Sequence, residues 1–224
     1  MPIVAVVSCD GGRIRTRAED SASASGVHGP AWHETKNASS ERMHAAKIAA
    51  EDPCPDLSDT FRRVAHVAKI AETAAFSASD DTNGDSPREP YRGPERALLT
   101  CLASMACSTN FGKQMEGKAQ RRLFFEPGRR MFIGDGLAWN WSIRDAHFPR
   151  FTAILDFIHA VQYLYEAAAA WELDDEGRWA RYLEFTQAVW QGRVDEVIAA
   201  IEQELAARGF PGRRMCPRGT RFVR

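Results

Sequence analysis

The chain lacks the cysteine pattern of a zinc finger or of a disulfide-bonded secreted domain. Its five cysteines are an odd number, and no two of them form a close Cys-x-x-Cys pair. A long hydrophobic run is missing too: the apolar stretch Ile3–Val7 is short and reaches a charge at Asp10. No segment approaches the roughly 18 apolar residues that a membrane span requires. These absences argue against a signal peptide and a membrane span, and they predict a cytoplasmic protein.

An excess of charge of one sign is also absent. The 29 Lys and Arg residues nearly balance the 30 Asp and Glu residues, giving a formal net charge of -1. No global basic field therefore indicates nucleic-acid binding. The sequence contains neither a Walker-type phosphate loop nor a Gly-x-Ser-x-Gly nucleophile elbow. What remains is an ordinary globular composition, with 224 residues available for one large or two small domains.

Two short acidic motifs stand out against this background. Asp10-Gly11-Gly12 follows the N-terminal apolar run, and Gly134-Asp135-Gly136 follows the segment 130–133. Each places an Asp-Gly at the end of an apolar, β-rich segment, where a strand is expected to stop. Mg²⁺ prefers oxygen ligands and is usually held by only one or two protein carboxylates. The pair predicts a two-metal phosphoryl-transfer site in which Asp10 and Asp135 are the catalytic and metal-binding residues.

Both motifs also have a purely structural interpretation. Asp-Gly is the strongest short hairpin signal, so Asp10 would only form the turn between strands at 3–9 and 13–17. Trp139 and Trp141, close to Asp135, favour core packing over a stacking surface for nucleic-acid bases.

A third constellation is Asp156 and His159, at the end of one predicted strand and the start of a helix. A histidine satisfied by a neighbouring carboxylate is the simpler interpretation of such a spacing. Because the pair follows the second acidic strand closely, we also consider Asp156 and His159 as supporting residues at a neighbouring strand end.

Apolar periodicity predicts a mixed α/β protein. Strands are expected at 3–9, 13–17, 31–37, 97–104, 130–134 and 151–156, and helices at 57–73, with Ser58 as N-cap, at 111–124 and over almost all of 158–208. The predicted domains are a core at 1–157 with an insertion at about 40–92, a helical region at 158–210, and a disordered basic tail at 211–224.

Local positive charge gathers despite the balanced total. We expect the exposed arginines at the first acidic motif and in the second half of the chain to contact DNA phosphates: Arg13, Arg121, Arg122, Arg129 and Arg130.

Several motifs in order carry a resemblance to a known family. They are the strand ending at Asp10, Trp32-His33-Glu34-Thr35-Lys36, Gly134-Asp135-Gly136 followed by Trp139 and Trp141, His147-Phe148-Pro149, Leu155-Asp156 with His159, and Trp190-Gln191-Gly192-Arg193. In this order the chain resembles the catalytic core of bacterial insertion-sequence transposases of the RNase H-like DD(E/D) type, nearest to the Mutator-related branch. The resemblance covers most of residues 3–205 and is weakest across 40–90.

The resemblance implies an RNase H-like mixed five-stranded sheet with flanking helices and a C-terminal all-helical insertion. It implies DNA cleavage and strand transfer at insertion-sequence ends with Mg²⁺ or Mn²⁺, acting on transposon and target DNA as a possible homo-oligomer. Asp10 would bridge both ions, Asp135 would hold one, and His159 would orient neighbouring groups.

The chain departs from the family at both ends. Family members carry a DNA-binding region before the first strand and a third acid, usually Glu, after the helical insertion, and neither has a counterpart here. Glu184 and Glu196 lie on predicted helices but in no matching motif. The chain is therefore expected to be an incomplete, inactive transposase fragment. Two alternatives are a non-catalytic remnant that binds DNA or a transposase subunit, and an actin-like-fold kinase, whose second phosphate turn and adenosine motif are missing.

Overall fold

The computed structural model describes residues 3–15, 32–46, 53–67, 69, 94–171 and 174–209. The chain divides into two compact units. The sheet unit comprises Met1–Lys47 and Ser79–Ile154, and the helical unit comprises Ile48–Ala78 and Leu155–Arg224. The predicted basic tail at 211–224 lies outside the described residues, as does most of the predicted insertion at 40–92.

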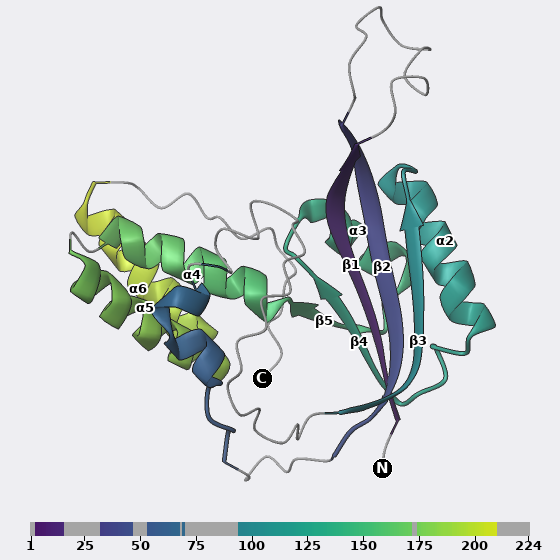
Figure 1. Ribbon diagram of the computed structural model, residues 1–224, viewed down its shortest axis with the longest axis horizontal. Coiled ribbons are helices and arrows are strands. Elements are labelled where there is room, and N and C mark those ends of the chain that lie inside the picture. Colours follow the sequence, from purple (N-terminus) through teal and green to yellow (C-terminus); the bar gives the residue numbers. More distant parts are fainter. Residues whose placement is uncertain are drawn as a thin grey trace, which may run out of the picture. The chain divides into compact units, whose positions relative to one another are not determined.

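The sheet unit is built on an open, mixed five-stranded sheet (Figure 1). Its strands are β1 (Ile3–Arg15), β2 (Trp32–His44), β3 (Glu95–Ser104), β4 (Arg129–Gly134) and β5 (Thr152–Leu155), in the order β3-β2-β1-β4-β5. β2 pairs antiparallel with β1 and β3, whereas β1 and β4 are parallel. The expected α/β class, the mixed sheet and the central place of β1 beside β4 are confirmed.

The predicted hairpin at Asp10 is wrong. β1 runs without a turn through Asp10, Gly11 and Gly12 to Arg15, and each of its residues pairs with β2. At Gly12 the absence of a side chain suits the close approach of β2, because a Cβ there would come within 3.2 Å of side-chain atoms of Thr35 and Asn37. Arg13 therefore belongs to the same strand as Asp10, and 13–17 is not a separate strand.

β2 is also longer than the predicted strand at 31–37. Its second half, Ala38–His44, is polar in composition but pairs with β1 on one side and β3 on the other. A strand between two partners has its backbone groups hydrogen-bonded, and its polar side chains can pair across strands, as Ser39 Oγ of β2 does with Ser8 Oγ of β1 at 2.8 Å. Hydrogen bonding to β1 and β3 therefore outweighs the weak strand propensity of residues 38–44.

Two helices and one face of the sheet enclose the core of this unit. α2 (Ser108–Arg121) and α3 (Ala138–His147) supply Phe111, Met115, Ala119 and Ile143, and β1 supplies Ala5, Val7 and Cys9. These alternate β1 residues share one face, as strand geometry requires. Val6 and Ser8 between them, and Asp10 after Cys9, are therefore on the opposite face.

The helical unit has its own core. α4 (Phe157–Trp171), α5 (Asp175–Trp190) and α6 (Val194–Ala207) pack around Val161, Leu164, Ala168, Tyr182, Phe185, Ala188 and Val197, together with Val67. The prediction of a helical 158–208 is confirmed. In the segment 57–73, a 3-10 turn, η2 (Asp59–Arg62), begins at the predicted cap Ser58, which accepts from Thr60 N at 3.4 Å, and 64–67 are helical.

Among the described residues, none of the helices combines the length and the apolar character that crossing a membrane requires.

Candidate metal-binding site

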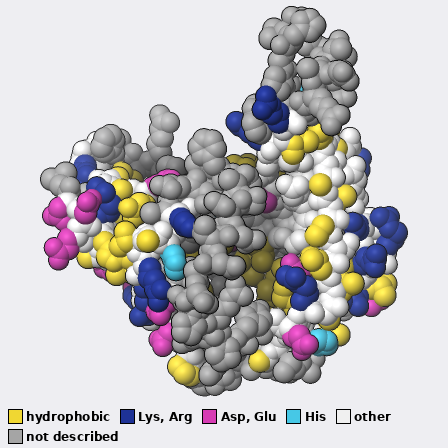
Figure 2. Space-filling model, viewed as in Figure 1, with side chains coloured by type: hydrophobic (Ala, Val, Ile, Leu, Met, Phe, Trp, Pro, Cys, Tyr) yellow, Lys and Arg dark blue, Asp and Glu magenta, His cyan; other side chains and the backbone are white. Residues whose placement is uncertain are grey.

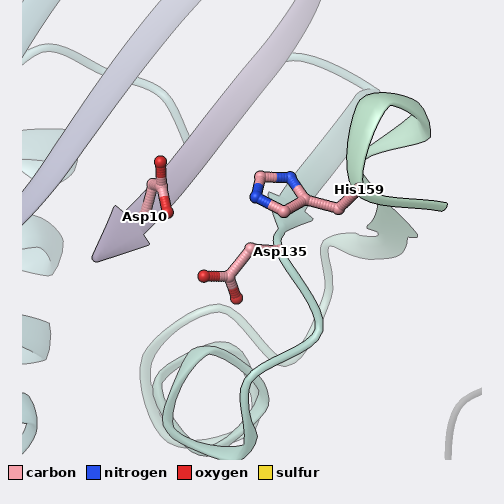
Figure 3. Close-up of side chains that lie close together, drawn as sticks. All are labelled: Asp10, Asp135 and His159. Carbon is pink, nitrogen blue, oxygen red and sulfur yellow. The ribbon is translucent and has the colours of Figure 1, made fainter. Parts of the chain in front are cut away.

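Two carboxylates from opposite halves of the chain meet at the end of the β1–β4 pairing. The parallel register ends with Cys9 opposite Gly134, and the next residue on each strand is Asp10 or Asp135. One carboxylate oxygen of Asp10 and one of Asp135 lie within 4.8 Å of each other (Figure 3). The expected proximity of the two carboxylates is confirmed, and Asp135 directly follows the end of β4 as expected. Asp10, however, lies inside β1, which continues to Arg15, and not at a strand end.

Asp10 is exposed because β1 continues beyond the point where its parallel neighbour β4 ends. β4 ends at Gly134, so beyond Cys9 only β2 remains hydrogen-bonded to β1, and Asn37 of β2 lies opposite Asp10. Strand alternation turns Asp10 away from the face on which Cys9 is buried. The strand therefore presents a carboxylate to solvent while its backbone stays paired.

Asp135 is held much more tightly than Asp10. It is 7% exposed, and its Oδ1 accepts hydrogen bonds from Leu137 N at 2.8 Å and from Asn140 Nδ2. Both bonds end on Oδ1, which leaves Oδ2 as the oxygen for a ligand. Gly136 has φ 101°, a left-handed conformation that favours glycine, and it lets the chain turn from β4 into α3. The motif Gly134-Asp135-Gly136 thus fixes one carboxylate at the start of a helix.

Asn140 is a site residue that the sequence reasoning missed. Its side chain is fully buried, and its Oδ1 has no hydrogen-bond partner in the part of the chain that the structure describes. The side chain approaches the end of β4 so closely that a Cβ at Gly134 would lie 3.0 Å from Nδ2. The signal available in the sequence was the glycine before Asp135 combined with an amide five residues after that acid.

Cys9 directly precedes Asp10, and the negative charge of both acids affects the pKa of its thiol. Burial raises the pKa of its thiol far above the ordinary value of 9.0, and the carboxylates of Asp135 and then Asp10 raise it further. Cys9 therefore stays a neutral thiol at physiological pH, and it adds no thiolate to a metal site beside it.

His159 and Asp156 are paired with each other. His159 lies in the first turn of α4, in the helical unit, and is the third residue labelled in Figure 3. Its Nδ1 is 3.1 Å from Asp156 Oδ2, while Asp156 Oδ1 accepts from Ile158 N at 3.1 Å. This is the carboxylate-satisfied histidine of the simpler interpretation. With the proton on Nδ1, the other ring nitrogen is left as an acceptor.

The predicted DNA-binding arginines do not gather at the acids. Arg121 is the last residue of α2, Arg122 caps that helix, and Arg129 and Arg130 begin β4 at the end opposite Asp135, about 17 Å away along the strand. Figure 2 shows Lys and Arg side chains on the side of the sheet unit where α2 lies. Only Arg13, three residues beyond Asp10 on β1, lies at the acidic end.

Arg130 and the paired tryptophans serve packing. Arg130 donates to Phe125 O at 2.8 Å, and its guanidinium lies 5.9 Å from the Phe151 ring centroid. Trp139 and Trp141 are partly buried against the core of the sheet unit, as expected. In the helical unit, Glu184 pairs with Arg181 at 2.8 Å, and Glu196 pairs with Arg193 at 2.7 Å.

The donor set of Asp10 and Asp135 suits a hard divalent cation. It offers two carboxylates, one buried and fixed and one exposed, with oxygens close enough to share an ion or a pair of ions. Comparison with protein-family models, curated proteins and solved structures gave no significant match to this chain.

Proposed function

We propose that the chain carries an RNase H-like, transposase-related core that binds a divalent cation, Mg²⁺ or Mn²⁺, at Asp10 and Asp135 and acts on DNA phosphodiesters. The observation that carries the proposal is the parallel β1–β4 register, which brings two acids from distant parts of the sequence to adjoining positions. Two neighbouring carboxylates are a donor set with which proteins hold Mg²⁺ beside phosphates.

Asp135 and Asp10 have different roles in this proposed site. Asp135 is pre-positioned, because two donors fix Oδ1 and burial prevents its carboxylate from swinging away. Asp10 is exposed on the open side of β1 and can approach a ligand from solvent. A divalent cation bound there would polarise a phosphodiester and activate the attacking water or hydroxyl.

Asp156 and His159 are the supporting residues of this proposal within the helical unit. Asp156 Oδ2 lies 3.1 Å from His159 Nδ1 and sets the direction of the ring, so the other ring nitrogen remains as a hydrogen-bond acceptor.

The second candidate function is a DNA-binding remnant without catalysis. The observation in its favour is that Asp135 and His159 already have structural duties, one at the start of α3 and the other at the start of α4. A carboxylate that only caps a helix needs no metal.

Nicking of a supercoiled plasmid tests the proposal. The full chain is compared with Asp10→Asn and Asp135→Asn, and with Asp145→Asn, which removes an exposed carboxylate on α3 paired to Arg144. Because the third acid of the family has no counterpart here, we expect at most weak nicking, which needs Mg²⁺ or Mn²⁺, falls to background in the first two variants and is unchanged in the third. Equal background in all four proteins would refute catalysis and favour the DNA-binding remnant.

A further inference from the structure

The two faces of β1 differ at the level of the acids. A Cβ at Gly11 would lie 3.9 Å from Trp139 Cζ2, so this position is on the face of the sheet where α3 packs. Asp10 and Gly12, the neighbours of Gly11 in the strand, are on the opposite face. A side chain that shares a ligand with Asp10 is therefore expected on the face away from α3.

Asn37 of β2 lies on the same face as Asp10. The two residues are directly opposite each other in the antiparallel register, an arrangement that puts both side chains on one face with their Cβ atoms about 5 Å apart. The contact at Gly12 agrees with this placement, because a Cβ there would lie 3.1 Å from Asn37 Nδ2. Asn37 is thus the neighbour of the Asp10 carboxylate on β2.

The carbonyl oxygen of the Asn37 side chain is available to a ligand. The side chain is exposed, and it makes no hydrogen bond with the residues that the structure describes. Its Nδ2 is on the Gly12 side, and no other Asn37 atom comes within 4 Å of the position of a Cβ at Gly12. Oδ1 is therefore directed away from Gly12. Hard divalent cations accept such carbonyl oxygens as ligands beside carboxylates.

Asp10 lies between two oxygen donors. The sheet order places β1 between β2 and β4, with Asn37 on one side of Asp10 and Asp135, directly after β4, on the other. Neighbouring strands are about 4.8 Å apart, so the two spaces between these three side chains are separated by a similar distance. Paired metal ions in phosphoryl-transfer sites are about 4 Å apart. The spacing of the sheet suits one cation on each side of Asp10.

We propose that Asp10 and Asn37 Oδ1 hold a second divalent cation, on the side of Asp10 away from Asp135. The inference rests on the proposed function, because it takes the cation at Asp10 and Asp135 as the first of the pair. Asp10 uses one carboxylate oxygen for each ion and bridges them. Since the second site offers one carboxylate and one neutral oxygen, the second cation binds more weakly than the first.

Titration with Mn²⁺, followed by electron paramagnetic resonance, counts the ions bound to the full chain. Two Mn²⁺ ions about 4 Å apart couple magnetically, and the coupled signal distinguishes the pair from an ion bound elsewhere on the surface. We expect two ions on the wild-type chain, with the coupled signal appearing as the weaker site fills. Thermal melts of the metal-free variants report folding.

For Asn37→Ala we expect the first Mn²⁺ to bind with wild-type affinity and the second at least about tenfold more weakly, with loss of the coupled signal. Asn37→Asp supplies a carboxylate instead of the amide and should tighten the second site about tenfold. Ala103→Asp, opposite Asn37 on β3, adds the same charge one strand farther from Asp10, and screening should limit its effect to about twofold. Asn110→Ala, at an exposed asparagine of α2, is the matched amide control and should change neither site.

A coupled pair of unchanged affinity in folded Asn37→Ala would overturn the assignment of Asn37. An Asn37→Asp protein whose second site is no tighter than that of Ala103→Asp would overturn it too, and this comparison decides if Asn37→Ala does not fold. A single Mn²⁺ on the wild-type chain, lost in Asp10→Asn and Asp135→Asn, would refute this inference alone and leave the proposed function standing. Absence of bound Mn²⁺ on the wild-type chain would refute both.

Discussion

At the scale of single residues, Asn140 positions the carboxylate of Asp135 at a cost in folding stability. Asn140 is fully buried with its Oδ1 unpartnered in the described part of the chain, and an unsatisfied buried acceptor costs about 1–3 kcal/mol. An apolar side chain of similar size would avoid that cost. What the amide provides instead is a donor to Asp135 Oδ1. A cost accepted in order to place a single carboxylate is typical of functional sites.

Cys9 gives a residue-scale prediction about pH. Its pKa is raised in the folded protein above the ordinary 9.0, so the unfolded chain releases the thiol proton first as the pH rises. The stabilising contribution is therefore complete below pH 9 and is lost above it, by up to about 1.4 kcal/mol per pH unit. Urea unfolding at a series of alkaline pH values should show this loss. Cys9→Ala should flatten it, and Cys101→Ala, at an exposed cysteine, should not. An identical pH slope in wild type and Cys9→Ala would contradict the prediction.

At the scale of elements, α2 and α3 are joined by a contact that depends on a glycine. His147 ends α3, and its Nδ1 lies 2.7 Å from Glu116 Oε2 on α2. The ring lies directly over Gly112: a Cβ there would come within 2.6 Å of His147 Cδ2 and 3.3 Å of Ile143 Cγ1. Glycine in mid-helix usually costs stability, but here it lets two helices approach closely.

Two glycine substitutions in α2 should consequently have opposite effects. Gly112→Ala forces His147 away from Glu116 and should destabilise the sheet unit by about 1–3 kcal/mol despite the better helix propensity of alanine. Gly117→Ala is the matched control: its new Cβ would meet only Arg121 at 3.6 Å, an ordinary contact, and should stabilise by about 0.5–1 kcal/mol. Urea unfolding of both variants measures the difference. Destabilisation of equal size in both would show that the contact with His147 is not the cause.

The elements show where sequence patterns suffice and where they fail. β3, β4 and β5 and the helices α4, α5 and α6 lie where apolar periodicity predicts them, whereas α3 has no counterpart among the predicted helices. β1 does not end at Asp10, because Asp-Gly-Gly forms a turn only when no partner strand extends alongside it, and β2 does. The polar half of β2 likewise has no strand pattern of its own and is ordered by its two neighbours. Long-range pairing decides both cases, and a local window of sequence contains none of it.

At the scale of the whole molecule, the sequence predicts the acids better than it predicts their surroundings. Asp10 and Asp135 are recognisable because each follows an apolar strand and precedes a glycine. Asn140 carries a weaker signal, because only the glycine before Asp135 and the place of the amide five residues after that acid point to it. The arginine pairs were wrongly expected near the acids because of their charge. Arg129 and Arg130 begin β4, at the end of the strand opposite to Asp135.

The central claim is that Asp10 and Asp135 hold a divalent cation together. Electron paramagnetic resonance of Mn²⁺ tests it most directly, because the signal of free Mn²⁺ disappears on binding and no cleavage is needed. The experiment titrates Mn²⁺ into the full chain and into Asp10→Asn, Asp135→Asn and Asp145→Asn, followed by competition with Mg²⁺. Thermal melts accompany each variant, so that loss of binding is not confused with loss of folding.

The account predicts that the wild-type chain and Asp145→Asn bind Mn²⁺ alike, that Mg²⁺ competes for the same site, and that Asp10→Asn and Asp135→Asn each bind at least about tenfold more weakly. Equal Mn²⁺ affinity in all four folded proteins would contradict it, and would leave the two carboxylates at the end of the β1–β4 pairing with a structural role only.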